Sequence, residues 1–361
     1  MKPAPVVLLE VPETGWLRAA RQGDAAAFDR LVEPHRRALL SHAYRLLGSV
    51  HDAEDLIQVA LLRAWRSLPR YREQASFRNW LYRIATNAGL DERTRRSRAA
   101  RLMPEARHAP TRSMPSGAPA NDTAWLEPFP DTLAENLVDA APGPDAVYSA
   151  RESVRLAFVA AIQHLPARQR AILLLRDVLG WSASETARAL SLTVAATNSA
   201  LQRARATLAK NYPAAETQSV SAGDDRRDQA LVDRYVQAWE SSNLDSFVAL
   251  LQEDATLSMP PWTQWYRGRA SIRRFFAWAF DWAWASRERA AFRFLSTAAN
   301  GQRAVAMYMR SRGESAYHAH ALQLLTVRDD RIAALTFFLD RRLFPKFGLP
   351  DLLPVEPQES R

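Results

Sequence analysis

A long stretch of this chain contains no lysine or arginine, although the whole sequence of 361 residues carries a formal net charge of +9. The stretch runs from Ser113 to Ala150, is rich in Pro, Ala, Ser and Asp, and is acidic. Such a composition buries too little apolar surface to order itself, so we expect residues 99–147 to form a flexible acidic linker. This linker constrains the fold strongly, because the residues before and after it must then form separate cores.

The residues before the linker have an almost entirely helical pattern. Apolar side chains recur every three or four positions over residues 28–47, and Gly48 interrupts this stripe. Further helices are expected over residues 51–68 and 76–98. We therefore predict an all-helical domain over residues 14–98.

After the linker, residues 148–212 contain two helices joined by a tight turn. Ser182 and Glu185 have the spacing of a capping box, and Thr193 can cap the helix that follows. We expect the second helix to turn Val194, Ala195, Ala200, Leu201, Ala204 and Leu208 inward and Thr197, Asn198, Ser199, Gln202, Arg203 and Arg205 outward. Such outward side chains suit a helix-turn-helix that contacts base edges and phosphates. A helical hairpin with a merely solvated basic face has the same pattern.

The remainder of the chain differs in kind. After a second linker over residues 213–227, residues 228–348 begin with two amphipathic helices and continue as alternating β-like segments. These segments are expected at 292–295, 304–309, 320–327 and 332–338, with a hairpin turn at 328–331. We predict an α+β domain.

Composition narrows the functional classes. The pI near 10.2 indicates a polyanionic partner. The absence of cysteine excludes disulfides, thiolate zinc sites and cysteine nucleophiles, and fits a reducing cytoplasm. No apolar run approaches the length of a signal peptide core or a membrane span, so we expect a cytoplasmic protein without a membrane partner.

Several motifs resemble those of bacterial RNA polymerase sigma factors of the extracytoplasmic-function (ECF) type, which keep only sigma regions 2 and 4. Region 2 is resembled by Arg45–Ser49 (RLLGS), Asp52–Gln58 (DAEDLIQ), Leu62–Trp65 (LRAW) and Phe77–Asn87 (FRNWLYRIATN). Region 4 is resembled by Leu165–Arg170 (LPARQR), Leu190-Ser191 and Ser199–Arg205 (SALQRAR). These motifs cover most of residues 1–210 outside the linker.

The resemblance implies roles for named residues. Binding to the clamp helices of core polymerase is implied for Asp52, Glu54, Asp55, Gln58, Leu61 and Leu62. Acids in the first turn of a helix also stabilise its dipole, and Val59 stands where the family usually has an acid. Contact with the promoter −10 element is implied for Asn79, Trp80, Tyr82, Arg83, Asn87, Arg93, Arg95 and Arg96, with the loop Arg70–Asn79 setting specificity. Trp80 also has the spacing of a core residue. Contact with the −35 element is implied for Thr193, Ala196, Thr197, Ser199, Arg203 and Arg205.

The linker and the last domain extend the resemblance. In the family the linker passes through the basic interior of the polymerase, although a simple tether needs only this composition. The sequence Trp125–Pro130 (WLEPFP) resembles a motif of the sigma-G-like subgroup, which carries an extra C-terminal domain. Residues 228–348 resemble the SnoaL-like domain, a cone with an apolar pocket. Its candidate lining residues are Trp262, Trp265, Trp282, His318 and His320, which equally suit a plain core or a docking face.

The sequence therefore predicts two all-α sigma domains plus an α+β SnoaL-like cone. We expect a non-enzymatic sigma factor that binds core polymerase through its clamp helices and flap, opens promoter DNA, and needs no metal or cofactor. An anti-sigma factor or a small-molecule ligand of the tail is a further candidate partner. The rival hypothesis is a ligand-sensing or enzymatic SnoaL-like protein that binds DNA as a conventional transcription factor.

Overall fold

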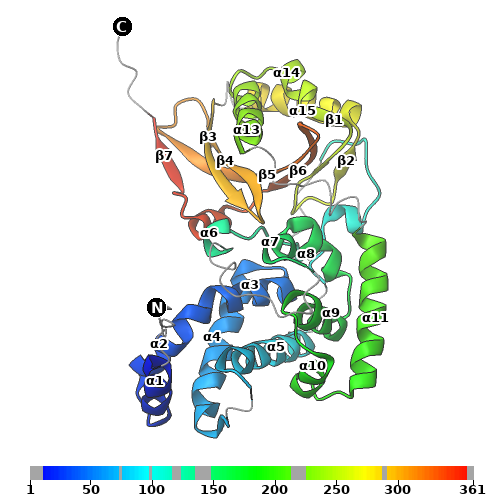
Figure 1. The fold of residues 1–361 in the computed structure, drawn as a ribbon. Helices are drawn as coiled ribbons and strands as arrows, with labels where there is room; N and C mark the ends of the chain where they lie inside the picture. Colours follow the sequence, from blue (N-terminus) through cyan, green and yellow to red (C-terminus); the bar gives the residue numbers. More distant parts are fainter. Residues whose placement is uncertain are drawn as a thin grey trace, which may run out of the picture.

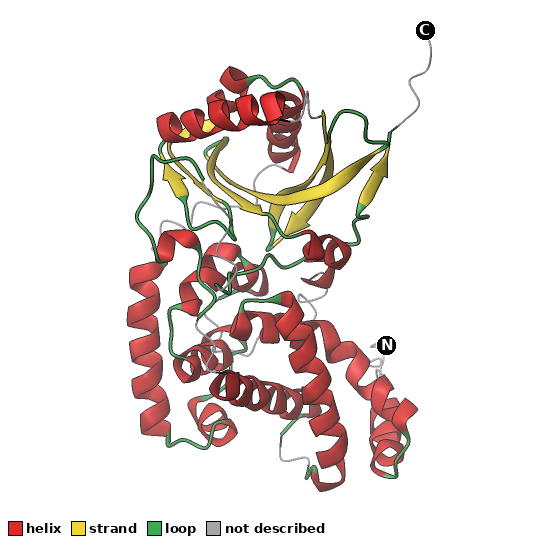
Figure 2. Cartoon of the chain, turned by 180° about the vertical axis from the view of Figure 1, so that it is seen from behind, coloured by secondary structure: helices red, strands yellow, loops and turns green. Residues whose placement is uncertain are grey.

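The computed structural model describes residues 11–72, 75–96, 100–115, 123–134, 148–212, 225–286 and 291–355. Two helical domains form the lower part of the molecule and an α+β domain, called the tail domain below, lies above them (Figures 1 and 2). None of the helices within these ranges combines the length and the apolar character that a membrane crossing needs.

The N-terminal helical domain has the predicted breaks at Gly48 and after Ser67, but the stripe over residues 28–47 is divided among two α-helices and a short 3-10 turn. Its helices are α1 (Val11–Arg21), α2 (Ala25–Val32), η1 (Glu33–His35), α3 (Arg36–Leu47), α4 (Val50–Ser67), η2 (Leu68–Arg70) and α5 (Phe77–Arg96). Gly48 ends α3 in the left-handed conformation, at φ 73°. The Ser49 hydroxyl accepts the amide of Asp52 at 3.1 Å and so caps α4. A tight corner between α3 and α4 follows from these two residues.

The second helical domain contains the predicted helix-turn-helix. Its helices are α7 (Ala150–Val154), α8 (Leu156–Gln163), α9 (Ala167–Leu173), the π-helical turn η4 (Leu174–Val178), α10 (Ala183–Ala189) and α11 (Val194–Asn211). Ser182 and Glu185 form the expected capping box at α10. The Thr193 hydroxyl accepts the amide of Ala196 at 3.1 Å, which caps α11 as predicted. Ser191, between the two helices, has a positive φ of 54°.

The tail domain folds three helices over one sheet. Its elements are α13 (Asp225–Glu240), α14 (Leu244–Ala249), β1 (Leu251–Ser258), β2 (Trp265–Arg267), α15 (Arg269–Ser286), β3 (Ala291–Ala299), β4 (Gln302–Arg310), β5 (Ala316–Arg328), β6 (Arg331–Phe338), η5 (Arg341–Phe347) and β7 (Leu352–Pro354). The strand order is β2-β1-β6-β5-β4-β3, and β7 pairs with β5. Asp329 and Asp330 both have positive φ, which makes the predicted turn a tight hairpin. Sequence periodicity did not identify β1, β2 or β7.

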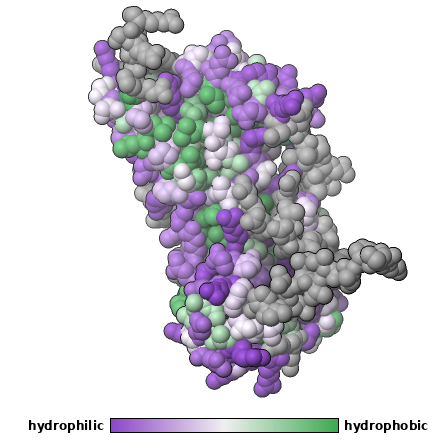
Figure 3. Space-filling model, turned by 60° about the vertical axis from the view of Figure 1, so that its left-hand side comes forward, coloured by the Kyte–Doolittle hydropathy of each residue, from purple (hydrophilic) through white to green (hydrophobic). Residues whose placement is uncertain are grey.

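The two faces of this sheet serve different cores. Phe292, Val305 and Phe337 belong to the core shared with α13, α14 and α15. Ala304, Ala306 and other residues of the opposite face belong to the core that continues through both helical domains. The small alanine side chains let the sheet approach its neighbours closely. Figure 3 shows that hydrophobic residues on one outer face gather mainly over the tail domain, while the middle of the molecule is mostly hydrophilic.

The described parts of the linker differ from the flexible tether that the composition predicted. They contain η3 (Pro104–Ala106) and α6 (Asp131–Ala134), and they lie between the helical domains and the tail domain. Leu126 and Phe129 are fully buried, and Trp125 and Met103 nearly so. The local composition is acidic, but these few large apolar side chains find partners on both sides, which offsets the entropy of ordering the segment.

Candidate functional site

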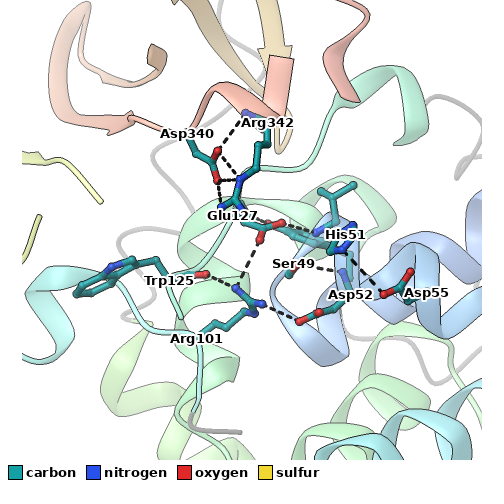
Figure 4. Close-up of polar contacts among 11 residues, drawn as sticks. Ser49, His51, Asp52, Asp55, Arg101, Trp125, Glu127, Asp340 and Arg342 are labelled. Carbon is teal, nitrogen blue, oxygen red and sulfur yellow. Dashed lines mark hydrogen bonds and ion pairs between the residues drawn. The ribbon is translucent and has the colours of Figure 1, made fainter. Parts of the chain in front are cut away.

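The start of α4 carries the residues expected to bind polymerase, and the first of them is already engaged within the chain. Asp52 is buried and pairs with Arg101 of the linker, with 2.7 Å between Nη2 and Oδ2 (Figure 4). Glu54 pairs with Lys346 of η5, in the tail domain. Two different segments therefore cover this end of α4.

Glu127, from the Trp125–Pro130 motif, completes this cover. Its carboxylate accepts the amide of Val50 at 3.0 Å, so it caps α4 from a distant segment. The Arg101 guanidinium lies 3.4 Å from the same carboxylate and also donates to the carbonyl of Trp125 at 3.0 Å (Figure 4). Burial raises the pKa of Glu127, and Arg101 partly opposes that rise. The linker motif is thus a capping group for the predicted polymerase-binding helix.

Beyond this start, the outward face of α4 is open to solvent. Asp55 and Gln58 are exposed, and Leu61 is half-buried. Leu62 is 57% exposed and Val59 44% exposed, which is unusual for large apolar side chains. An uncovered apolar and acidic strip therefore continues along α4 beyond the covered start.

The α5 residues expected at the −10 element divide into buried and accessible groups. Trp80 is buried with its ring 4.9 Å from that of Tyr71. Tyr82 is buried with its ring 5.1 Å from that of His42. Neither ring is available to a DNA base in this conformation. Arg83 is exposed and Asn79 half-buried. The side chains of Arg93, Arg95 and Arg96 lie outside the described residues.

Most of the α11 residues expected at the −35 element form an accessible row. Thr193, Ala196, Ser199 and Arg203 are exposed. Thr197 was expected to face outward but is fully buried. Its hydroxyl donates to the carbonyl of Thr193 at 3.0 Å, so the hydroxyl has a hydrogen-bond partner without water. The prediction of an outward Thr197 is wrong for this structure.

The beginning of α11 brings a related correction. Val194 was expected to pack inward but is 45% exposed, and Ala195 is exposed as well. The buried side of α11 is made instead by Thr197, Ala200, Leu201, Ala204 and Leu208. The predicted inward face was therefore right except in the first turn, where the helix extends beyond the core.

Arg205 is held by an acid that the sequence did not single out. Its guanidinium donates to both carboxylate oxygens of Asp177 in η4, at 2.8 and 2.6 Å. Asp177 is buried, and the hydrogen bonds that its carboxylate accepts raise the pKa of the Arg205 guanidinium above its usual value. The pair fixes the orientation of this arginine on α11.

The two helical domains contact each other directly. The fully buried Arg170 donates to the carbonyl of Leu46 at 2.5 Å, and Arg45 donates to the carbonyl of Ser153 at 3.1 Å. At the far end of the contact, the Asn87 amide donates to the carbonyl of Ala189 at 3.1 Å. A residue expected at the −10 element therefore touches the helix-turn-helix.

One residue of the tail domain joins the remaining segments, and the sequence did not identify it. Asn300, in the β3–β4 turn, is fully buried with φ 57°. Its side-chain oxygen accepts the amide of Phe129 at 2.8 Å. Its side-chain nitrogen donates to the Tyr44 hydroxyl at 3.0 Å and to the Val154 carbonyl at 2.6 Å. Asn300 thus links the tail domain to the linker and to both helical domains.

The candidate pocket residues of the tail domain do not form one group. Trp265 faces the linker, where its indole donates to the carbonyl of His108 at 2.7 Å. Trp262 packs against the interior cluster, and the Trp282 side chain lies outside the described residues. His318 pairs across the strands with Met309, whereas His320 occupies a β-bulge. Within the described ranges, no three acidic or histidine side chains gather closely enough to hold a metal ion.

Aromatic side chains fill much of the interior of the tail domain. The Trp239 ring lies 5.3 Å from both Phe276 and Phe280. Behind it, the Tyr235 hydroxyl donates to Gln323 at 2.8 Å, and burial raises the pKa of Tyr235. These contacts resemble those of a packed core.

Family models match all three folded parts. Residues 31–99 match Sigma-70 region 2, residues 155–208 match Sigma-70, region 4, and residues 232–335 match a SnoaL-like domain. The predicted fold class of two helical sigma domains and an α+β cone is thereby confirmed.

Known proteins resemble most of the chain. It is 43% identical over 335 residues to the ECF RNA polymerase sigma factor SigG of Mycobacterium tuberculosis, covering 92% of this chain and 86% of the relative. It is 32% identical over 194 residues to SigM of the same species, covering 54% of this chain and 81% of that protein. The crystal structure of the M. tuberculosis sigma factor SigJ has the same fold, with a TM-score of 0.53 and 23% identity, covering 87% of this chain and 97% of that one.

Proposed function

Because this chain belongs to the ECF RNA polymerase sigma factors, we propose that its two helical domains divide promoter recognition, with α5 serving the −10 element and α11 the −35 element. We assign residues 14–98 to region 2, 148–212 to region 4 and 228–348 to the SnoaL-like domain, with linkers at 99–147 and 213–227. As a sigma factor, the chain binds core RNA polymerase and promoter DNA.

The contact between regions 2 and 4 implies that the chain must open to work. The two promoter elements are about 25 base pairs apart, which is about 85 Å along B-form DNA at about 3.4 Å per base pair. In the present arrangement Asn87 of α5 touches Ala189 of the helix-turn-helix. The two regions cannot reach both elements in that arrangement, so we infer that this arrangement is a closed state of the factor.

We assign polymerase binding to α4. The exposed Val59 and Leu62, with Asp55 and Gln58 on the same helix, offer an apolar and acidic strip for a basic partner helix. Asp52 and Glu54 would join this strip once Arg101 and Lys346 release them. This part of α4 is the single feature that most favours a sigma factor over a conventional transcription factor, which has no need of it.

The relatives are named as RNA polymerase sigma factors. We propose that this chain is a non-enzymatic regulator of transcription, in which the tail domain performs no reaction and modulates the sigma module. The aromatic packing around Trp239 and the docking of the opposite sheet face support a structural role for this domain. Since core polymerase acts in the cytoplasm, we place the protein there.

The test is run-off transcription on fragmented genomic DNA with purified full-length chain and core polymerase. We expect transcripts from promoters that core polymerase alone ignores. Arg203→Ala on the exposed face of α11 should weaken initiation at −35-dependent promoters, whereas Lys210→Ala at the end of the same helix is the matched control. If no promoter responds and the chain binds duplex DNA without polymerase, the rival transcription-factor hypothesis is favoured.

A further inference from the structure

The N-terminal helix α1 ends against the segment that precedes α5. Arg21, the last residue of α1, donates from Nη2 to the carbonyl of Tyr71 at 2.5 Å. Its guanidinium carbon also lies 5.7 Å from the centre of the Tyr71 ring. Since the region 2 family model begins at residue 31, α1 lies outside the matched part of the domain. A helix that the family model does not include therefore contacts the DNA-facing part of region 2.

Tyr71 holds together the structure around the loop Arg70–Asn79, of which all but residues 73 and 74 are described. Its hydroxyl donates to the carbonyl of Ala75 at 2.6 Å, which joins the two sides of the loop. Its amide donates to the carbonyl of Leu68 at 3.0 Å, and its ring lies 4.9 Å from Trp80. Movement of Tyr71 would therefore move the loop relative to α5.

We propose that Arg21 is a positioning residue for promoter selectivity: it fixes Tyr71, and through Tyr71 it fixes the loop that discriminates among −10 sequences. The proposal rests on the proposed function, because it takes this loop to contact the −10 element. Hydrogen bonds to a base tolerate only small displacements, so a loop that discriminates bases needs such support.

The chemistry of arginine suits this position. Its planar guanidinium stacks on an aromatic ring and donates a directed hydrogen bond at the same time. A lysine keeps the charge but lacks the planar group, so it can replace only part of the contact. Phenylalanine at position 71 would keep the ring and remove the hydrogen bond from its hydroxyl to the carbonyl of Ala75.

The experiment measures discrimination by reconstituted holoenzyme. Transcription is compared on a responsive promoter and on variants with single-base changes in the −10 or the −35 element. The chains are wild type, Arg21→Ala, Arg21→Lys, Tyr71→Phe and the control Arg18→Ala. Arg18 is an exposed arginine on the same helix.

We expect Arg21→Ala to reduce −10 discrimination about fivefold or more, the size of one lost base contact. Discrimination at the −35 element should stay unchanged. Arg21→Lys should have a smaller effect, and Arg18→Ala none. If Arg21→Ala does not fold, Arg21→Lys and Tyr71→Phe decide the question by the same ratio.

A loss of transcription that is equal on every −10 variant would show a merely structural role and overturn the proposal, as would unchanged discrimination. Failure of the proposed function is a separate result. In that case the wild-type chain starts no transcription with core polymerase on any promoter.

Discussion

The Asn300 side chain offers a direct way to loosen the closed state. In Asn300→Ala the backbone amide can still donate to the carbonyl of Phe129, but the three side-chain hydrogen bonds are lost. The Phe129 amide and the Val154 carbonyl then have no partner at this junction, whereas the Tyr44 hydroxyl keeps its donation to the carbonyl of Glu127 at 2.8 Å. Each unsatisfied buried group costs about 1–3 kcal/mol, so we expect the closed state to lose about 2 kcal/mol or more. That corresponds to a change of about thirtyfold or more in its equilibrium constant.

Single-molecule energy transfer can measure this change. The chain has no cysteine, so cysteines introduced at the exposed positions His51 at the start of α4 and Arg341 in the tail domain are the only labelling sites, and the Lys346–Glu54 pair brings these two segments together in the closed state. We expect Asn300→Ala to move molecules from the high-transfer to a low-transfer population. The matched control is Asn243→Ala, because Asn243 caps α14 by accepting the Ser246 amide at 2.9 Å, away from the junction.

The result that refutes this reasoning is a folded Asn300→Ala chain with the transfer distribution of the wild type. In that case the apolar contacts between the sheet and the helical domains would hold the closed state without the hydrogen bonds. An equal shift in the Asn243→Ala control would show that any weakening of the tail domain opens the molecule, which contradicts a specific role for Asn300.

Three further outcomes follow from the structure. Leu62→Ala should weaken binding to core polymerase by about 1–2 kcal/mol without lowering thermal stability, because the side chain is exposed. A titration with labelled core polymerase measures the loss of binding, and a lowered melting temperature would contradict the prediction. Hydrogen bonds from Ser182 lower the pKa of Glu185. The ionised Glu185 side chain should therefore stabilise α10 at pH values above the usual glutamate pKa, and this stabilisation should disappear as the pH falls through the lowered pKa. Glu185→Gln should flatten that pH dependence in circular dichroism melts, and an unchanged profile would argue against it. Deleting the residues after Pro213 should change the amount of transcription but not the set of promoters used. Sequencing the 5′ ends of transcripts tests this prediction, and a different promoter consensus would count against the proposal.

Local sequence patterns predicted the helices and their ends well, since capping residues and glycine act over a few positions. Ser182 and Thr193 cap the helices at which they were expected. The cap at Ser49 was not predicted, although the break at Gly48 beside it was. The hairpin of the tail domain was predicted for the same reason. Strand β1 was missed, because a strand that pairs in parallel with the distant β6 depends on partners that a local window does not contain.

The candidate site shows the same limit. Motifs predicted which helices serve each promoter element, but they did not predict which side chains of those helices are exposed. Thr197 lies on the buried side of α11, where the carbonyl of Thr193 satisfies its hydroxyl, and Asn87 contacts the carbonyl of Ala189 in the other helical domain. The Asn300-Gly301 pair is a hairpin-turn signal, but it does not indicate the contacts that Asn300 makes with other domains, since an asparagine in a turn usually serves that turn alone.

The position of Asn300 in the chain sets the order in which the closed state can form during synthesis. Its partners Tyr44, Phe129 and Val154 all precede it, the last of them by 146 residues. At about 5–20 residues per second, the ribosome needs on the order of ten seconds to reach Asn300 after Val154. During that interval the nascent sigma module lacks its contacts with the tail domain, so Glu54 at the start of α4 is not yet paired with Lys346 and is open to polymerase near the ribosome.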